Sequence, residues 1–138
     1  MKILFPLLTS ILFLTSCASL SHYPGIGRTR KYTFEHPQVP QSFDGFRIAF
    51  VSDIHYPSKF KRKHLHNLVR ALRDLQPDLL LLGGDYQEGC EYVEELFTEL
   101  GRVHPPYGTA GVLGNNDYER CTEQIRECME RHQIRVLE

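Results

Sequence analysis

Residues 47–55, Arg-Ile-Ala-Phe-Val-Ser-Asp-Ile-His, decide the fold class of this chain of 138 residues. They begin as an apolar run of β-forming residues, the pattern of a strand that is buried on both faces of a parallel sheet. The run leads into a carboxylate and an imidazole, Asp53 and His55. If the backbone stays extended there, the two-residue period of a strand puts both side chains on one side. We therefore predict a buried strand that ends in reactive polar groups.

The pattern after this strand becomes helical. Apolar residues recur at three- and four-residue steps, which predicts an amphipathic helix over residues 65–75 that is ended by Gln76-Pro77. Two more strand–helix units and the start of a fourth strand follow, with predicted strands over 78–83, 109–114 and 134–138 and predicted helices over 90–100 and 122–132. We expect Gly101 to cap the second helix at its C-terminus. This alternation dictates parallel pairing, so the predicted fold class is α/β, a βαβαβαβ parallel-sheet layer.

Polar residues follow each of the first three predicted strands. Asp53 and His55 end the first, Asp85 ends the second within Gly83-Gly84-Asp85, and Asn115 stands in Gly114-Asn115-Asn116-Asp117 after the third. Ligands collect at the carboxyl ends of parallel strands, where the buried scaffold opens to solvent. Carboxylate and amide oxygens beside one imidazole nitrogen suit Mn²⁺, Fe or Zn²⁺. The sequence therefore predicts a metal site that joins Asp53, His55, Asp85 and Asn115.

These three segments resemble, in order and spacing, the Asp-x-His, Gly-Asp and Gly-Asn-His-Asp/Glu motifs of the calcineurin-like metallophosphoesterases. The flanking Pro77-Asp78 and Tyr107-Gly108 are most similar to the bacterial membrane-associated branch of that superfamily. The resemblance extends over residues 46–138. It implies the first half of a metallophosphoesterase β-sandwich flanked by helices, and hydrolysis of a phosphomonoester, phosphodiester or pyrophosphate.

The resemblance also implies the role of each residue. Asp53 and His55 would hold a first divalent ion, Asp85 would bridge two ions (Mn, Fe or Zn), and Asn115 would bind the second ion and the phosphate. Such a pair activates the attacking hydroxide and neutralises the phosphoryl oxygens. A bridging ligand needs two anionic oxygens, which Asp85 offers and Asn115 does not. For Asp53, His55 and Asp85 the alternative is ordinary turn and capping chemistry, which we also expect of Asp117.

One departure from the family pattern lies at Asn116, where the family usually has histidine. An amide cannot act as a general acid near neutral pH, so Asn116 cannot protonate a leaving group as histidine does. We therefore expect either a substrate with a good leaving group, such as a phosphoanhydride, or a proton from another side chain.

A second departure concerns the remaining metal ligands. The family completes its sites with histidines from Gly-His and Gly-His-x-His segments, and this sequence contains no Gly-His dipeptide. We interpret four other histidines as surface or capping residues: His64, His66, His104 and His132. We thus expect residues 45–138 to be a C-terminally truncated domain with weak activity. Its exposed apolar sheet face and free edge would favour aggregation or dependence on a partner.

The N-terminus predicts a lipoprotein signal peptide over residues 1–17. Lys2 precedes an apolar run too short to span a bilayer comfortably, and Leu14-Thr15-Ser16-Cys17 resembles a lipobox in which Cys17 is lipidated. A buried helix with a core cysteine is the alternative. Residues 18–44 are interpreted as a tether with a short edge strand near 31–35. Ala18 resembles the signal for outer-membrane delivery, so we expect a lipid-anchored envelope protein on the periplasmic side.

Composition and cysteines limit the other functions. A formal net charge of -1 argues against nucleic-acid binding, and we interpret the basic residues 59–63 as a solvated helix start. Three cysteines remain beside Cys17, namely Cys90, Cys121 and Cys128, so we expect at least one free thiol. We interpret Cys121 and Cys128 as packing residues. The expected partner is a phosphorylated small molecule or lipid. The alternatives are a catalytically inactive envelope lipoprotein and, less favoured because no glycine-rich loop follows the first strand, a nucleotide-binding domain.

Overall fold

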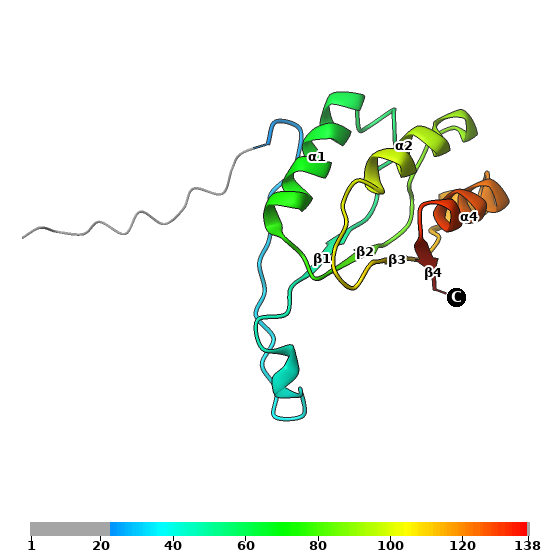
Figure 1. Cartoon of the computed structure of the whole chain (residues 1–138). Helices are drawn as coiled ribbons and strands as arrows, with labels where there is room; N and C mark the ends of the chain where they lie inside the picture. Colours follow the sequence, from blue (N-terminus) through cyan, green and yellow to red (C-terminus); the bar gives the residue numbers. More distant parts are fainter. Residues whose placement is uncertain (1–22, 138) are drawn as a thin grey trace, which may run out of the picture.

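The computed structural model describes residues 23–137 (Figure 1). The predicted signal peptide and Cys17 lie outside the described residues. The elements in chain order are η1 (Gln41–Phe43), β1 (Ile48–Val51), α1 (Arg62–Leu75), β2 (Leu79–Leu82), η2 (Cys90–Tyr92), α2 (Val93–Leu100), β3 (Thr109–Gly111), α3 (Asn115–Glu119), α4 (Thr122–Arg131) and β4 (Ile134–Val136).

The four strands form one parallel sheet in the order β1-β2-β3-β4. Neighbouring strands pair in register at Ala49 with Leu80, Leu81 with Ala110, and Ala110 with Arg135. Sequential strands that pair in parallel must be joined by crossovers, and helices supply them here. The predicted α/β class with a βαβαβαβ parallel-sheet layer is confirmed.

The long helices α1, α2 and α4 lie on one side of the sheet (Figure 1). Their apolar faces and the inward side chains of the strands form the core, which includes Leu65, Leu80, Leu96 and Ile125, each 0% exposed. The opposite face of β1 is open among residues 23–137, where Ile48 and Phe50 are 58% and 66% exposed. The prediction that this strand is buried on both faces is therefore wrong for the described chain. An apolar run cannot show which side the helices will cover.

Local boundaries differ from the predictions in several places. Residues 31–35 form no strand, and Tyr32 and Phe34 are exposed there, so the predicted edge strand is wrong. The predicted strand over 109–114 ends at Gly111, and residues 112–114 lead into the short helix α3 at Asn115. The first turn of the predicted helix over 90–100 is the 3-10 helix η2. Gly101 caps α2 with right-handed backbone angles and donates its N–H to Phe97 O.

A disulfide joins Cys90 to Cys121, and Cys128 is a free, buried thiol. The expectation of one free thiol agrees with this pairing. The interpretation of Cys121 as a packing residue without a bond is wrong, because β2 and β3 lie side by side and bring the segments that follow them together.

Within residues 23–137, no helix has both the length and the apolar character needed to cross a membrane.

Candidate metal site at the carboxyl edge of the sheet

The segments that follow β1 and β2 stay paired beyond the strands. Asp53 N–H donates to Gly84 O at 3.0 Å, His55 N–H donates to Asp85 O at 3.0 Å, and Tyr56 N–H donates to Tyr86 O at 3.0 Å. These bonds fix one loop against the other, since each buried backbone group that is paired avoids a desolvation cost. The first two sequence motifs are therefore held side by side by main-chain contacts.

The backbone is left-handed at Asp53, His55 and Asp85, three of the predicted metal ligands. The φ angles are +56° at Asp53, +47° at His55 and +55° at Asp85. Such angles cost a residue with a Cβ roughly 1–3 kcal/mol, and they cluster at functional sites. Asp53 and His55 do lie close together, as expected, but the expected cause, an extended backbone, is wrong. Two left-handed turns bring their side chains together, and sequence alternation does not reveal them.

Asp53, His55 and Asp85 each offer a ligand atom, and these atoms lie within 4.8 Å of one another. Asp53 is exposed, and the other two are half-buried. Two carboxylates and an imidazole suit a divalent cation of borderline hardness, so the residues present fit the group that the sequence predicts. The cluster lies at the carboxyl edge of β1 and β2, as the sequence predicts for these three residues.

A neighbouring carboxylate orients the imidazole. His55 Nδ1 lies 2.6 Å from Glu88 Oε1, across 33 residues of sequence. A bond at Nδ1 leaves Nε2 as the free ring nitrogen, and a carboxylate behind a histidine is a common support for a metal ligand. Glu88 is not among the site residues predicted from the sequence. Its position three residues after Asp85, on a loop paired with that of His55, is the signal that could have found it.

The third segment is tied to the second by a buried carboxylate. Asp117 is 0% exposed and accepts N–H bonds from Asp85 at 2.7 Å, Tyr86 at 3.0 Å and Gly114 at 2.9 Å. Burial raises the pKa of the Asp117 carboxyl, and these three donors oppose the rise. The bond from Gly114 is the expected capping contact of α3. The two bonds to the loop after β2 are additional and fix Asp85.

Glycine is required where these two loops meet. A Cβ on Gly114 would lie 2.1 Å from Asp85 Oδ1, and a Cβ on Gly84 would lie 2.3 Å from Gly114 N. Gly84 also has a φ of +87°, which favours glycine. The motif glycines thus permit the close approach that positions Asp85.

The calcineurin-like phosphoesterase family pattern matches residues 46–135. The chain belongs to this family. Three motifs at three adjacent strand ends, with two carboxylates and an imidazole gathered there, agree with that assignment. Calcineurin-like phosphoesterases are metal-dependent hydrolases, and the Asp53, His55 and Asp85 cluster is the candidate metal-binding group at this edge.

Several family members are similar in sequence to the chain. An uncharacterized metallophosphoesterase of Aquifex aeolicus is 28% identical over 80% of this chain and 42% of its own length. The UDP-2,3-diacylglucosamine pyrophosphatase LpxG of Chlamydia trachomatis is 30% identical over 69% of this chain and 30% of its own length. The uncharacterized metallophosphoesterase YkuE of Bacillus subtilis is 26% identical over 69% of this chain and 34% of its own length. The chain thus spans less than half of each relative. No solved structure matches it.

The two asparagines of the third family motif differ in their surroundings. Asn115 is the exposed first residue of α3. Asn116 donates its backbone N–H to Asp85 Oδ1 at 3.0 Å and its side-chain amide to Gln87 O. The Asn116 side chain therefore ties α3 to the loop after β2, a contact that sequence analysis did not predict. Its catalytic role, like the roles of Asp53, His55, Asp85 and Asn115, stays a prediction.

The four histidines interpreted as surface or capping residues lie outside the loops that form this cluster. His64 and His66 belong to α1, His104 lies in the turn before β3, and His132 caps α4. His66 Nε2 lies 3.8 Å from Glu99 Oε1. His132 contacts Glu94, so its environment is more specific than the expected surface position.

Proposed function

We propose that this chain carries the metal-binding segment of a metal-dependent phosphoesterase that acts on a phosphoanhydride. The observation that carries the proposal is the cluster of Asp53, His55 and Asp85, whose ligand atoms lie within 4.8 Å of one another inside the segment that the family pattern matches. Asp53 and His55 would hold one divalent cation, and Asp85 would use its second oxygen toward another. Divalent cations held there supply Lewis-acid stabilisation of the phosphoryl oxygens and an activated water.

The residues of the chain position these ligands. Glu88 holds the His55 ring through Nδ1, and the Asn116 backbone N–H holds one oxygen of Asp85. Asn115 is proposed to contact the phosphate and the second cation from the start of α3. The remaining ligands of a dinuclear site have no Gly-His counterpart in this sequence. We therefore propose that the chain binds one cation more strongly than a second.

The choice of a phosphoanhydride as the substrate rests on Asn116. Its side chain contacts Gln87 O and carries no acidic proton near neutral pH, so it offers no general acid to a poor leaving group. A phosphate leaving group needs no such help. LpxG, one of the similar family members, is named for cleavage of a pyrophosphate bond in a lipid-linked nucleotide. This supports a phosphorylated lipid or small molecule as the substrate class.

We also propose that Cys17 is lipidated and anchors the protein to the cell envelope, with residues 18–44 as a tether. A lipid anchor would place the site beside lipid-linked substrates. The measurement is incorporation of a labelled fatty acid into the full chain in bacteria, with Cys17→Ser as the matched variant. Equal labelling of both proteins would contradict the anchor.

The test of the enzymatic proposal is metal content together with hydrolysis. The full chain is loaded with Mn²⁺, Fe²⁺ or Zn²⁺ and assayed on a nucleoside diphosphate-linked substrate and on bis-p-nitrophenyl phosphate, with Asp85→Asn as the inactive variant. We expect metal binding that Asp85→Asn weakens and turnover that is faster on the anhydride. A folded protein that hydrolyses neither substrate, and whose metal affinity Asp85→Asn does not change, would instead favour the inactive envelope lipoprotein that retains the fold for binding.

A further inference from the structure

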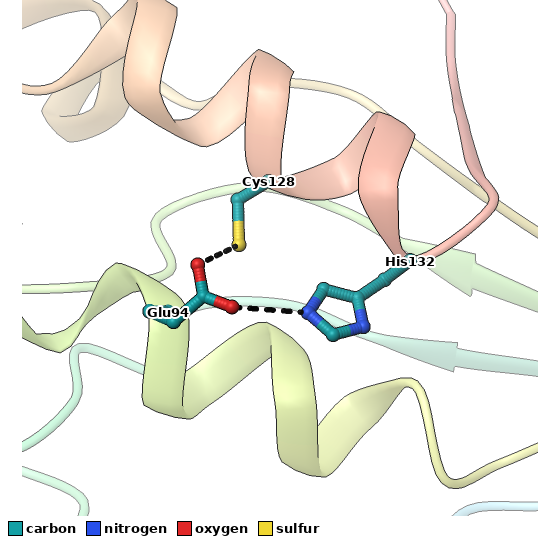
Figure 2. Close-up of side chains that lie close together, drawn as sticks. All are labelled: Glu94, Cys128 and His132. Carbon is teal, nitrogen blue, oxygen red and sulfur yellow. Dashed lines mark hydrogen bonds and ion pairs between the residues drawn. The ribbon is translucent and has the colours of Figure 1, made fainter.

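A second group of potential metal ligands lies between α2 and α4, outside the phosphoesterase motifs. Cys128 and His132 stand four residues apart at the end of α4, and Glu94 faces them from α2 (Figure 2). One ligand atom from each residue lies within 4.8 Å of the others. Cys128 Sγ lies 3.5 Å from Glu94 Oε2, and His132 Nε2 lies 3.5 Å from Glu94 Oε1.

The chemistry of these three side chains favours one class of metal. A thiolate, an imidazole and a carboxylate suit Zn²⁺, whereas Mg²⁺ and Ca²⁺ prefer oxygen ligands alone. A tetrahedral Zn²⁺ ion holds sulfur about 2.3 Å and nitrogen about 2.0 Å away, which spaces these two atoms by roughly 3.5 Å. The three groups therefore need side-chain movements of only about an ångström to close on one ion. Residues at i and i+4 of a helix lie on one face, so Cys128 and His132 can bind the same ion.

The surroundings hold these ligands in place. Cys128 is 0% exposed, whereas the side chains of His132 and Glu94 are 24% and 59% exposed. The site is thus closed on the sulfur side and open to water on the carboxylate side. Gly101 leaves room for the imidazole, because a Cβ there would lie 3.1 Å from His132 Nδ1. Thr98 Oγ1 lies 3.5 Å from the same nitrogen, His132 Nε2, so a metal bound there would replace this contact.

One cation already faces this group. The Arg131 guanidinium contacts Glu94 Oε2, so an incoming metal would displace it from that oxygen. Because Arg131 is 56% exposed on its side chain, it can turn toward solvent. A metal here would replace a partly exposed ion pair, which contributes little to stability, by coordinate bonds.

We propose that Glu94, Cys128 and His132 form a zinc site that ties α2 to α4, with water at the fourth position. On binding, the thiol proton of Cys128 leaves to solvent and the thiolate coordinates the ion. The site is independent of the phosphoesterase cluster, since its ligands come from helices and that cluster comes from loops after β1 and β2.

The test is Co²⁺ binding to the full chain in detergent, with Cys17→Ser in every variant so that Cys128 is the thiol left beside the Cys90–Cys121 disulfide. We expect a sulfur-to-cobalt charge-transfer band that Zn²⁺ abolishes. Cys128→Ser should lose the band, and His132→Ala should weaken Zn²⁺ binding at least tenfold. Asp85→Asn should keep the band, because the phosphoesterase cluster contains no sulfur. Arg131→Gln should strengthen binding.

A second measurement covers variants that fold poorly. Zn²⁺ should raise the Tm of the Asp85→Asn protein and should leave the Tm of the Asp85→Asn, Cys128→Ala protein unchanged, because binding to the folded state stabilises it. Co²⁺ bound without a charge-transfer band would overturn the proposal. An equal Tm shift with and without Cys128 would overturn it as well.

Discussion

The backbone N–H of Asp85 donates to the Asp117 carboxylate at 2.7 Å across 32 residues of sequence. The same carboxylate accepts the N–H groups of Tyr86 and Gly114, so it joins the loop after β2 to the start of α3. This buried carboxylate therefore connects the second and third family motifs. Its removal tests whether the site is held by packing or by these bonds.

Asp117→Ala should lower the free energy of unfolding by about 3 kcal/mol, because one buried and two part-buried N–H groups lose an ionised acceptor. Asp117→Asn keeps the shape and part of the bonding, so it should cost less. Urea denaturation is the measurement. Glu119→Ala, at an exposed position of the same helix, should change stability by less than about 0.5 kcal/mol and is the control. Equal effects of Asp117→Ala and Glu119→Ala would contradict this role.

Glu88→Gln should weaken metal binding at the His55 cluster about 10–100-fold, because a carboxylate behind a ligating imidazole fixes its tautomer and orientation. Titration with Mn²⁺ or Zn²⁺, followed by calorimetry, measures the loss. Glu91→Gln, at an exposed position nearby in sequence, is the matched control. To separate this cluster from the proposed site at Cys128, both variants are made in a Cys128→Ser background. Unchanged affinity in Glu88→Gln would show that the His55 contact does not serve a metal.

Gly114→Ala should disturb Asp85 directly. The added Cβ would lie 2.1 Å from Asp85 Oδ1 and 2.6 Å from Asp85 N, so the loops must move apart. We expect a loss of about 1–3 kcal/mol in unfolding free energy and weaker metal binding. Gly27→Ala is the control, since a Cβ at Gly27 would meet nothing within 4 Å. A Gly114→Ala protein with unchanged stability and metal affinity would contradict the packing described for these motifs.

Reduction of the Cys90–Cys121 disulfide should destabilise the fold. The bond closes a loop with a sequence separation of 31, for which the chain-entropy relation gives about 3–4 kcal/mol. Guanidinium unfolding with and without dithiothreitol measures this loss. The Cys90→Ser, Cys121→Ser protein should not respond to the reductant. If the wild-type midpoint is also insensitive, the disulfide does not stabilise the domain.

Asn116→His should raise hydrolysis of a substrate with a poor leaving group relative to an anhydride. An imidazole supplies a general acid, which typically contributes about 10²–10⁴-fold, although the variant also loses the Asn116 contact with Gln87 O. The ratio of kcat/KM values on the two substrates isolates the proton-transfer effect from this loss. A ratio that does not change would argue against the leaving-group explanation.

The order of the four sheet strands and the three longer helices, the parallel pairing and the positions of Asp53, His55 and Asp85 at one edge could be predicted from the sequence. Hydrophobic period, chain direction and the spacing of the motifs are local properties, and the rule that places ligands at the carboxyl ends of strands needs only these. The asparagine in place of histidine at Asn116 is likewise visible in the sequence. Its contact with Gln87 O is not.

Only the tertiary structure decided which groups support the site and which face is open. The Glu88 contact with His55 and the bonds of Asp117 to Asp85 and Tyr86 join segments about 30 residues apart, so no local pattern encodes them. The left-handed turns at Asp53 and His55 are not visible in the hydrophobic pattern either. The Cys90–Cys121 pairing and the Glu94, Cys128 and His132 group have the same origin. The physical reason is that side-chain partners depend on where parallel strands deliver their loops, while the sequence fixes only the type and order of the elements.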